Sequence, residues 1–94
     1  MRLQKWEIEE IKKAAKIVFG EEVKVILFGS RVDDNKKGGD IDLYVITDNP
    51  SYEKKKRFWI ELQERLGEQK IDIILSEDSN RSIEKTALKE GVEL

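Results

Sequence analysis

The stretch that decides the fold reads Phe28-Gly29-Ser30 and, after nine further residues, Asp40-Ile41-Asp42. Residues 23–28 form an almost continuous apolar and β-branched run, which predicts a strand. Residues 40–47 predict a second strand, and the polar segment 29–39 between them is long enough to reverse the chain. We therefore expect these two strands to run antiparallel, which brings Gly29 and Ser30 close to the two acids.

Helices and a third strand are expected around this stretch. The predicted helices cover residues 3–19, 50–66 and 79–90, and the predicted third strand covers residues 70–75. Asn49 is expected to cap the second helix, with Pro50 in its first turn. The buried stripe of this helix is expected to comprise Phe58, Trp59, Leu62 and Leu66.

The order strand–helix–strand over residues 40–75 is typical of a βαβ unit, in which the two strands are parallel. We therefore predict an α+β fold: a small mixed sheet of three to four strands with helices packed on it. Residues 1–94 are too few for two cores and form one domain. Parallel strands would also bring Asp72, near the start of the third strand, to the sheet end that carries Asp40 and Asp42.

Three carboxylates at one sheet end predict a metal site. Asp40 and Asp42 are two residues apart, so their side chains share one face of the strand, with Cα atoms ~7 Å apart. Paired carboxylates repel unless a cation compensates them, and two Mg²⁺ ions would do so. Asp72 could ligate the second ion and accept or orient the proton of an attacking hydroxyl. A purely structural interpretation, edge-strand acids that oppose aggregation, fits one such acid better than three.

The Gly-Ser corner is the candidate phosphate site. Gly29 lets the backbone approach phosphate oxygens, and Ser30 offers a hydroxyl and a backbone donor. Arg31, Lys36 and Lys37 could neutralise triphosphate charge, although the two lysines could equally be solvated loop residues. The chain contains no P-loop or Gly-x-Gly-x-x-Gly motif, so the mononucleotide and dinucleotide folds that use them are not supported.

Composition narrows the chemistry further. With 18 basic and 20 acidic residues the net charge is −2, which argues against direct nucleic-acid binding by the whole surface. The basic run at residues 54–57 is expected to be solvated surface, ~20 Å from the acids. Without cysteine or histidine, only oxygen ligands can hold a metal. No segment is typical of a membrane span or signal peptide, so we expect a cytoplasmic protein.

Gly29-Ser30-Arg31, its spacing to Asp40-Ile41-Asp42-Leu43, and Asp72 in a later apolar strand resemble the polymerase-beta-like nucleotidyltransferase superfamily. The small size is similar to that of the minimal nucleotidyltransferases (MNT), which are encoded beside HEPN-domain toxins. The resemblance implies that Gly29 and Ser30 contact the phosphates, and that the three acids are catalytic and ligate metal. It also implies an antitoxin that pairs with an HEPN toxin and transfers AMP from ATP to a tyrosine of that ribonuclease.

The chain departs from the superfamily pattern directly after Arg31. Val32-Asp33-Asp34 stands where many relatives have a small residue, a second arginine and glycine. This difference removes a phosphate or partner contact and adds negative charge. Two alternatives to protein adenylylation also stay open: an antitoxin that only masks its partner, and nucleotidyl transfer to a small molecule.

Overall fold

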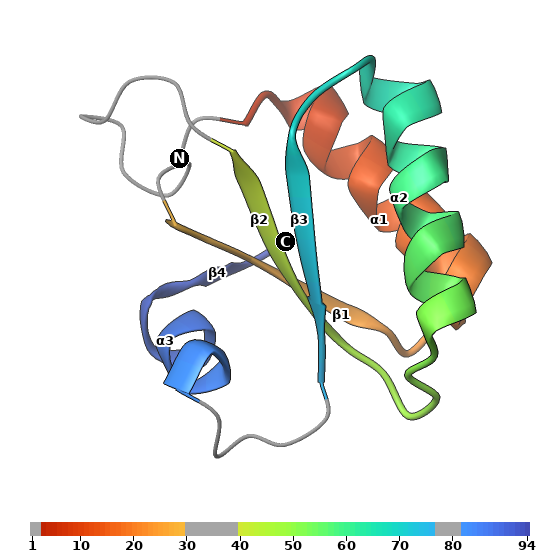
Figure 1. Ribbon diagram of the computed structural model, residues 1–94. Helices are drawn as coiled ribbons and strands as arrows, with labels where there is room; N and C mark the ends of the chain where they lie inside the picture. The colour runs from red at the N-terminus through yellow and green to blue at the C-terminus, as the bar shows by residue number, and fades with distance from the viewer. Residues whose placement is uncertain (1–2, 30–39, 77–81) are drawn as a thin grey trace.

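A computed structural model describes residues 3–29, 40–76 and 82–94, and it confirms the α+β class (Figure 1). The described sheet has four strands in the order β3-β2-β1-β4. Along the chain the elements are α1 (Lys5–Phe19), β1 (Lys24–Phe28), β2 (Ile41–Ile46), α2 (Tyr52–Leu66), β3 (Ile71–Leu75), α3 (Ser82–Glu90) and β4 (Val92–Glu93). Residues 79–81, where the last helix was predicted to begin, lie outside the described part.

The pairing of the strands sets the position of the acids. β1 and β2 are antiparallel, with Phe28 opposite Asp42, and β2 and β3 are parallel, with Asp42 opposite Asp72. Both predicted directions are confirmed. The last residue of β1 and the acids of β2 and β3 therefore lie in one row across the sheet.

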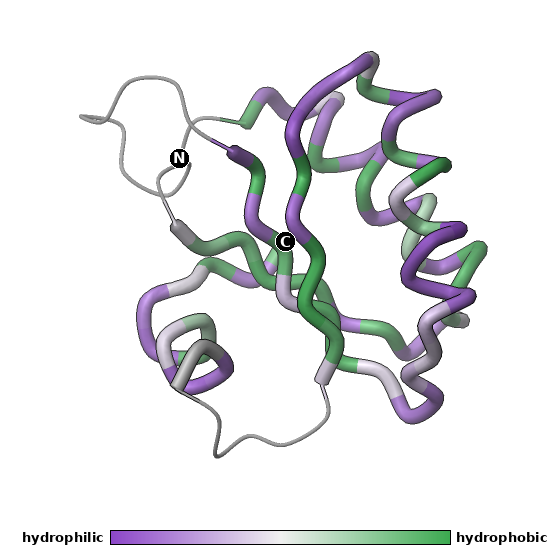
Figure 2. The backbone as a smooth tube through the Cα atoms, in the orientation of Figure 1, coloured by the Kyte–Doolittle hydropathy of each residue, from purple (hydrophilic) through white to green (hydrophobic). Residues whose placement is uncertain are grey.

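Helices cover the two faces of the sheet unequally. In Figure 1, α1 and α2 lie together on one face and α3 lies on the other. The larger core fills the first side, where Ile41, Leu43 and Val45 of β2 are fully buried. A smaller cluster lies under α3 and consists of Ile26, Phe28, Tyr44 and Ala87. Figure 2 shows the hydrophobic residues concentrated along the strands, while α1 and α2 carry polar residues on their outer sides.

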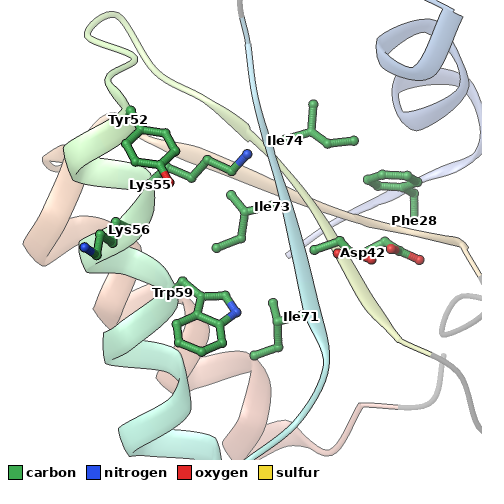
Figure 3. A pocket seen from close by; sticks show the side chains of 10 residues that line it. Phe28, Asp42, Tyr52, Lys55, Lys56, Trp59, Ile71, Ile73 and Ile74 are labelled. Carbon is green, nitrogen blue, oxygen red and sulfur yellow. The ribbon is translucent and has the colours of Figure 1, made fainter.

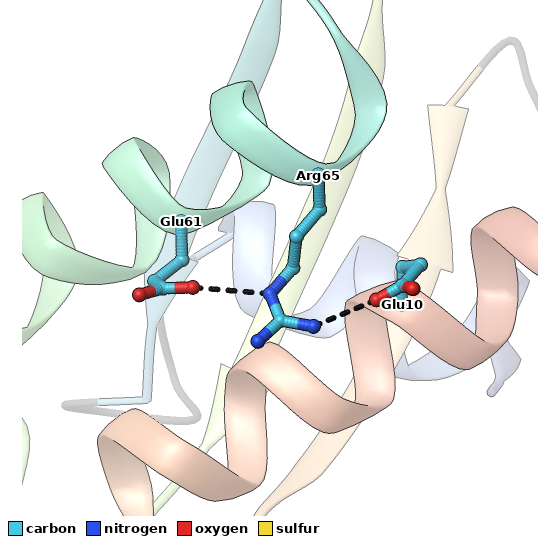
Figure 4. Close-up of polar contacts among 3 residues, drawn as sticks. All are labelled: Glu10, Glu61 and Arg65. Atoms are coloured by element: carbon cyan, nitrogen blue, oxygen red, sulfur yellow. Dashed lines mark hydrogen bonds and ion pairs between the residues drawn. The ribbon is translucent and has the colours of Figure 1, made fainter.

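One arginine joins the two larger helices. Arg65 of α2 donates through Nη1 to Glu10 Oε2 of α1 at 2.7 Å and through Nε to Glu61 Oε2 at 3.0 Å (Figure 4). Beside this polar contact, the rings of Phe19 and Phe58 meet edge to face, with centroids 5.5 Å apart. Together these contacts fix α2 against α1 over the first face of the sheet.

The start of α2 differs from the prediction. Ser51, not Asn49, is the cap: its backbone is extended and its hydroxyl accepts from the N–H of Lys54 at 3.1 Å. Asn49 instead donates its own N–H to Thr47 Oγ1 at 3.3 Å, so it belongs to the preceding turn. Pro50 consequently precedes the cap and does not occupy the first helical turn.

Exposed aromatic and aliphatic side chains mark both large helices. Phe58, Leu62 and Leu66 are buried as predicted, whereas Trp59 is 44% exposed and does not belong to the buried stripe. Trp6 and Ile17 of α1 are also exposed. Among the described helices, none combines the length and apolar character needed to cross a membrane.

Candidate active site

The three acids predicted from the sequence come together at one end of the sheet. Asp42 lies in β2 directly beside Asp72 of β3, and Asp40 immediately precedes β2. Lys70 is the neighbouring cation: its Nζ lies 3.4 Å from Asp40 Oδ2. This ion pair is largely exposed on the lysine side, where the side chain is 75% accessible, so it offsets only part of the negative charge.

Asp42 is the electrostatic centre of the group. Partial burial raises the pKa of Asp42 above its ordinary value of 3.8, and the charges of Asp72 and Asp40 raise it further. The charge of Lys70 lowers that pKa, but it is the smallest contribution. The ionised cluster is therefore short of positive charge, and a bound cation would relieve it.

The backbone of Gly29 lies directly against the Asp42 carboxylate. Its φ of +80° lies in the left-handed region, and a Cβ at this position would collide with Asp42 Oδ2. The sequence suggested that Gly29 allows close approach to phosphate; the structure shows close approach to Asp42. The other predicted phosphate residues, Ser30 and Arg31, and also Lys36 and Lys37, lie outside the described residues.

The donor chemistry of the cluster fits a hard divalent cation. All three candidate ligands are carboxylates, and oxygen donors of this kind suit magnesium or manganese. Across residues 3–29, 40–76 and 82–94, no three acidic, histidine or cysteine side chains stand close enough together to enclose an ion. The assignment of Asp40, Asp42 and Asp72 as ligands therefore stays a prediction.

A cavity of about 700 Å³ adjoins the acids (Figure 3). Asp42 and Asp72 line it together with Lys55, Lys56 and Trp59 of α2. The basic run at 54–57 was expected to be solvated surface away from the acids; of its members, Lys55 and Lys56 line the same cavity as the acids, on its α2 side.

A buried glutamate on the acid face was not singled out from the sequence. Glu84 of α3 is completely buried, and it accepts a hydrogen bond from the Tyr44 hydroxyl at 3.3 Å. Tyr44 follows Asp42 by two residues and so lies on the same face of β2. The sequence feature that could have predicted its burial is the three-residue spacing of Glu84 and Ala87, which puts both on the inner face of α3.

Comparison with known proteins identifies a family that the chain matches. A family model described as "Polymerase beta, Nucleotidyltransferase" matches residues 7–94. The matched span contains Gly29 and all three acids. Proteins of this family generally use a nucleoside triphosphate and a divalent metal. A comparison with curated proteins found no match.

Proposed function

The chain belongs to the polymerase beta nucleotidyltransferase family, and from this premise we propose that it transfers AMP from ATP to a hydroxyl group of a partner protein. Nucleotidyl transfer in general follows from the family. The nucleotide, the metal and the acceptor are the parts that the proposal adds.

The observation that carries the proposal is the pairing of Asp42 with Asp72, with Gly29 lying against the Asp42 carboxylate. Asp42 and Asp72 are direct neighbours in the register of β2 and β3, and the pKa of Asp42 is raised by burial and by the other two acids. A fold gains no stability by crowding carboxylates in this way. The arrangement is useful if the carboxylates hold cations that in turn bind phosphate.

In the proposed reaction the acceptor hydroxyl oxygen attacks the α-phosphorus of ATP. A new phosphorus–oxygen bond forms, the bond to the bridging oxygen breaks, and pyrophosphate leaves. We assign the role of proton acceptor to Asp72; its exposure, the highest of the three acids, and its position in the cavity lining support this role. Asp40 and Asp42 would hold two Mg²⁺ ions with Asp72, and bound Mg²⁺ supplies charge stabilisation for the phosphates.

For the acceptor we propose a tyrosine of an HEPN-domain toxin, which makes this chain the antitoxin of a toxin–antitoxin pair. The support is the resemblance of its motifs and small size to the minimal nucleotidyltransferases. The position of the cavity agrees with this acceptor, because exposed Tyr52 and Trp59 border it. An acceptor side chain from a second protein could thus reach the acids from solvent.

Labelled ATP tests the transfer directly. The purified chain is incubated with α-labelled ATP, Mg²⁺ and the proposed partner, the product of the neighbouring gene, and the double variant Asp40→Asn/Asp42→Asn is compared. Asp48→Asn is the matched control, since Asp48 is exposed and lies beyond the other end of β2. We expect label on that partner with the wild type and the control, and none with the double variant.

Two results would contradict the proposal, and each would favour a different function. Inhibition of the toxin by the double variant, without label on the toxin, would indicate masking by binding. Label on a small hydroxyl compound and none on protein would indicate a small-molecule acceptor.

Nucleotide binding is measured separately, by thermal unfolding with and without ATP. A ligand that binds only the folded state at 100 times its dissociation constant stabilises that state by about 2.7 kcal/mol. We therefore expect ATP with Mg²⁺ to raise the melting temperature of the wild type. Asp40→Asn/Asp42→Asn should lose the part of this shift that depends on Mg²⁺.

A further inference from the structure

The outer edge of β3 presents backbone N–H and C=O groups. β3 is an outer strand of the described sheet, paired only with β2. Ile41 donates its N–H to the Lys70 carbonyl, and Ser76 donates its N–H to the Val45 carbonyl. Even-numbered residues of this segment therefore turn their backbone groups toward β2. Because backbone direction alternates along a strand, Ile71 and Ile73 turn their N–H and C=O groups to the open side.

The two sides of this edge differ in charge. Figure 3 shows Lys55, Lys56 and Trp59 of α2 on one side of β3, and Asp42 with Phe28 on the other. All of them line the same cavity, so the cavity bends around the strand. An occupant of the edge would thus meet cations and an indole ring on its first side and the catalytic carboxylates on its second.

We propose that the edge of β3 binds the acceptor as an extended peptide, and that acidic residues directly flank its reactive hydroxyl residue. This inference rests on the proposed function and specifies its substrate. The peptide would add a strand to the sheet and pair with the open backbone groups of Ile71 and Ile73.

The alternation of side chains along a strand predicts a sequence preference for the bound peptide. Successive side chains of an extended peptide point to opposite faces. A hydroxyl residue turned toward Asp42 and Asp72 therefore has both immediate neighbours turned toward α2. Lys55 and Lys56 lie on the α2 side, so acidic residues are favoured at the two peptide positions next to the hydroxyl residue. Peptide residues two positions away point back to the carboxylate side, where acidic residues are disfavoured.

A peptide fits this surface better than a nucleic acid strand. The backbone of a peptide has both N–H and C=O groups to match those of β3, whereas a nucleic acid has phosphates. A continuous row of phosphates beside β3 would also lie against Asp42 and Asp72. The cavity of about 700 Å³ is within the usual range of about 300–1,000 Å³ for binding sites.

Two fluorescent peptides of identical composition test the preference. Each contains one tyrosine and two glutamates in an otherwise neutral background, with the glutamates either one or two positions from the tyrosine. Binding is measured by anisotropy without ATP. Two exposed ion pairs support about fivefold tighter binding of the first peptide. Equal affinities, or tighter binding of a single-stranded RNA oligonucleotide that displaces the peptide, would overturn the proposal.

Variants of α2 locate the bound peptide. Lys55→Glu/Lys56→Glu should reverse the preference toward a peptide with lysines beside the tyrosine. The matched control is Lys54→Glu/Arg57→Glu, which makes the same charge change in the same basic run outside the cavity lining. An equal effect of both double variants would mean that only the net charge matters, and would refute docking at this edge.

Tryptophan variants add a test that does not depend on charge. Trp59→Ala should weaken peptide binding, whereas Trp6→Ala, at a similarly exposed tryptophan on α1, should leave it unchanged. AMP transfer is then measured with the same peptides. Peptide selectivity without transfer would refute the proposed function and keep the docking site, whereas transfer without selectivity would do the opposite.

Discussion

Replacement of Asp42 by asparagine should stabilise the fold while it abolishes activity. Adjacent strands are ~4.8 Å apart, and at that separation two unit charges repel by about 1 kcal/mol in a water-like medium. The lower, solvated figure applies because Asp72 is exposed and Asp42 is only partly buried. Asp42→Asn should therefore raise the free energy of unfolding by about 1 kcal/mol, which corresponds to ~4–8 °C in the melting temperature of a domain of this size.

The pH dependence of this gain follows from the sign of the pKa shift. The pKa of Asp42 is raised in the folded state, so between 3.8 and the raised value the folded protein binds more protons than the unfolded one. The stability contributed by Asp42 is present below pH 3.8 and is lost as the pH rises through the raised pKa. The advantage of Asp42→Asn should thus be greatest at neutral pH.

Thermal unfolding without metal, at pH 7 and at pH 3.5, measures both effects. Asp48→Asn is again the control, and it should change the melting temperature little at either pH. Lower stability of Asp42→Asn at pH 7, or an advantage that grows on acidification, would refute the electrostatic reasoning.

Three further substitutions test packing and backbone geometry. Gly29→Ala should cost more than Gly67→Ala in denaturant unfolding: both glycines have positive φ, worth about 1–2 kcal/mol, but only a Cβ at residue 29 meets a neighbour. Equal costs would show that the carboxylate moves aside freely. A double-mutant cycle of Glu10→Gln and Arg65→Gln should give a coupling of about 0.5–1 kcal/mol, since both side chains are mostly covered, and zero coupling would contradict its role between the helices. Phe58→Ala should lower the free energy of unfolding by about 3–5 kcal/mol; a small loss would mean that the core refills the space.

The central strands and the position of Asp72 beside Asp42 were predictable from the sequence, because short-range patterns determine them. The two-residue spacing of Asp40 and Asp42 and the βαβ order were sufficient to place Asp72 beside Asp42. The predicted element ends lie within one or two residues of those observed in β1, β2 and β3. Such patterns depend on neighbours along the chain and on the direction of strands.

The surroundings of the site were not predictable, because they depend on how far each element extends over its neighbour. Trp59 follows Phe58 and looks like part of the buried stripe. However, α2 lies over the outer strand, so one flank of the helix has no described strand beneath it. The same geometry brings Lys55 and Lys56 to the cavity. The cap at Ser51 was missed for a local reason, since Asn49 and Ser51 are both good caps on either side of Pro50.

The open edge of β3 also affects how copies of the chain behave in solution. An apolar outer strand with unpaired backbone groups can pair with the same strand of another copy. Such a pair would bring the lysines of the two α2 helices toward one another, and their repulsion opposes self-association. Screening over a Debye length of about 3 Å at 1 M salt removes most of that repulsion. The chain should therefore self-associate more readily at high ionic strength, and Lys55→Glu/Lys56→Glu should change this salt response.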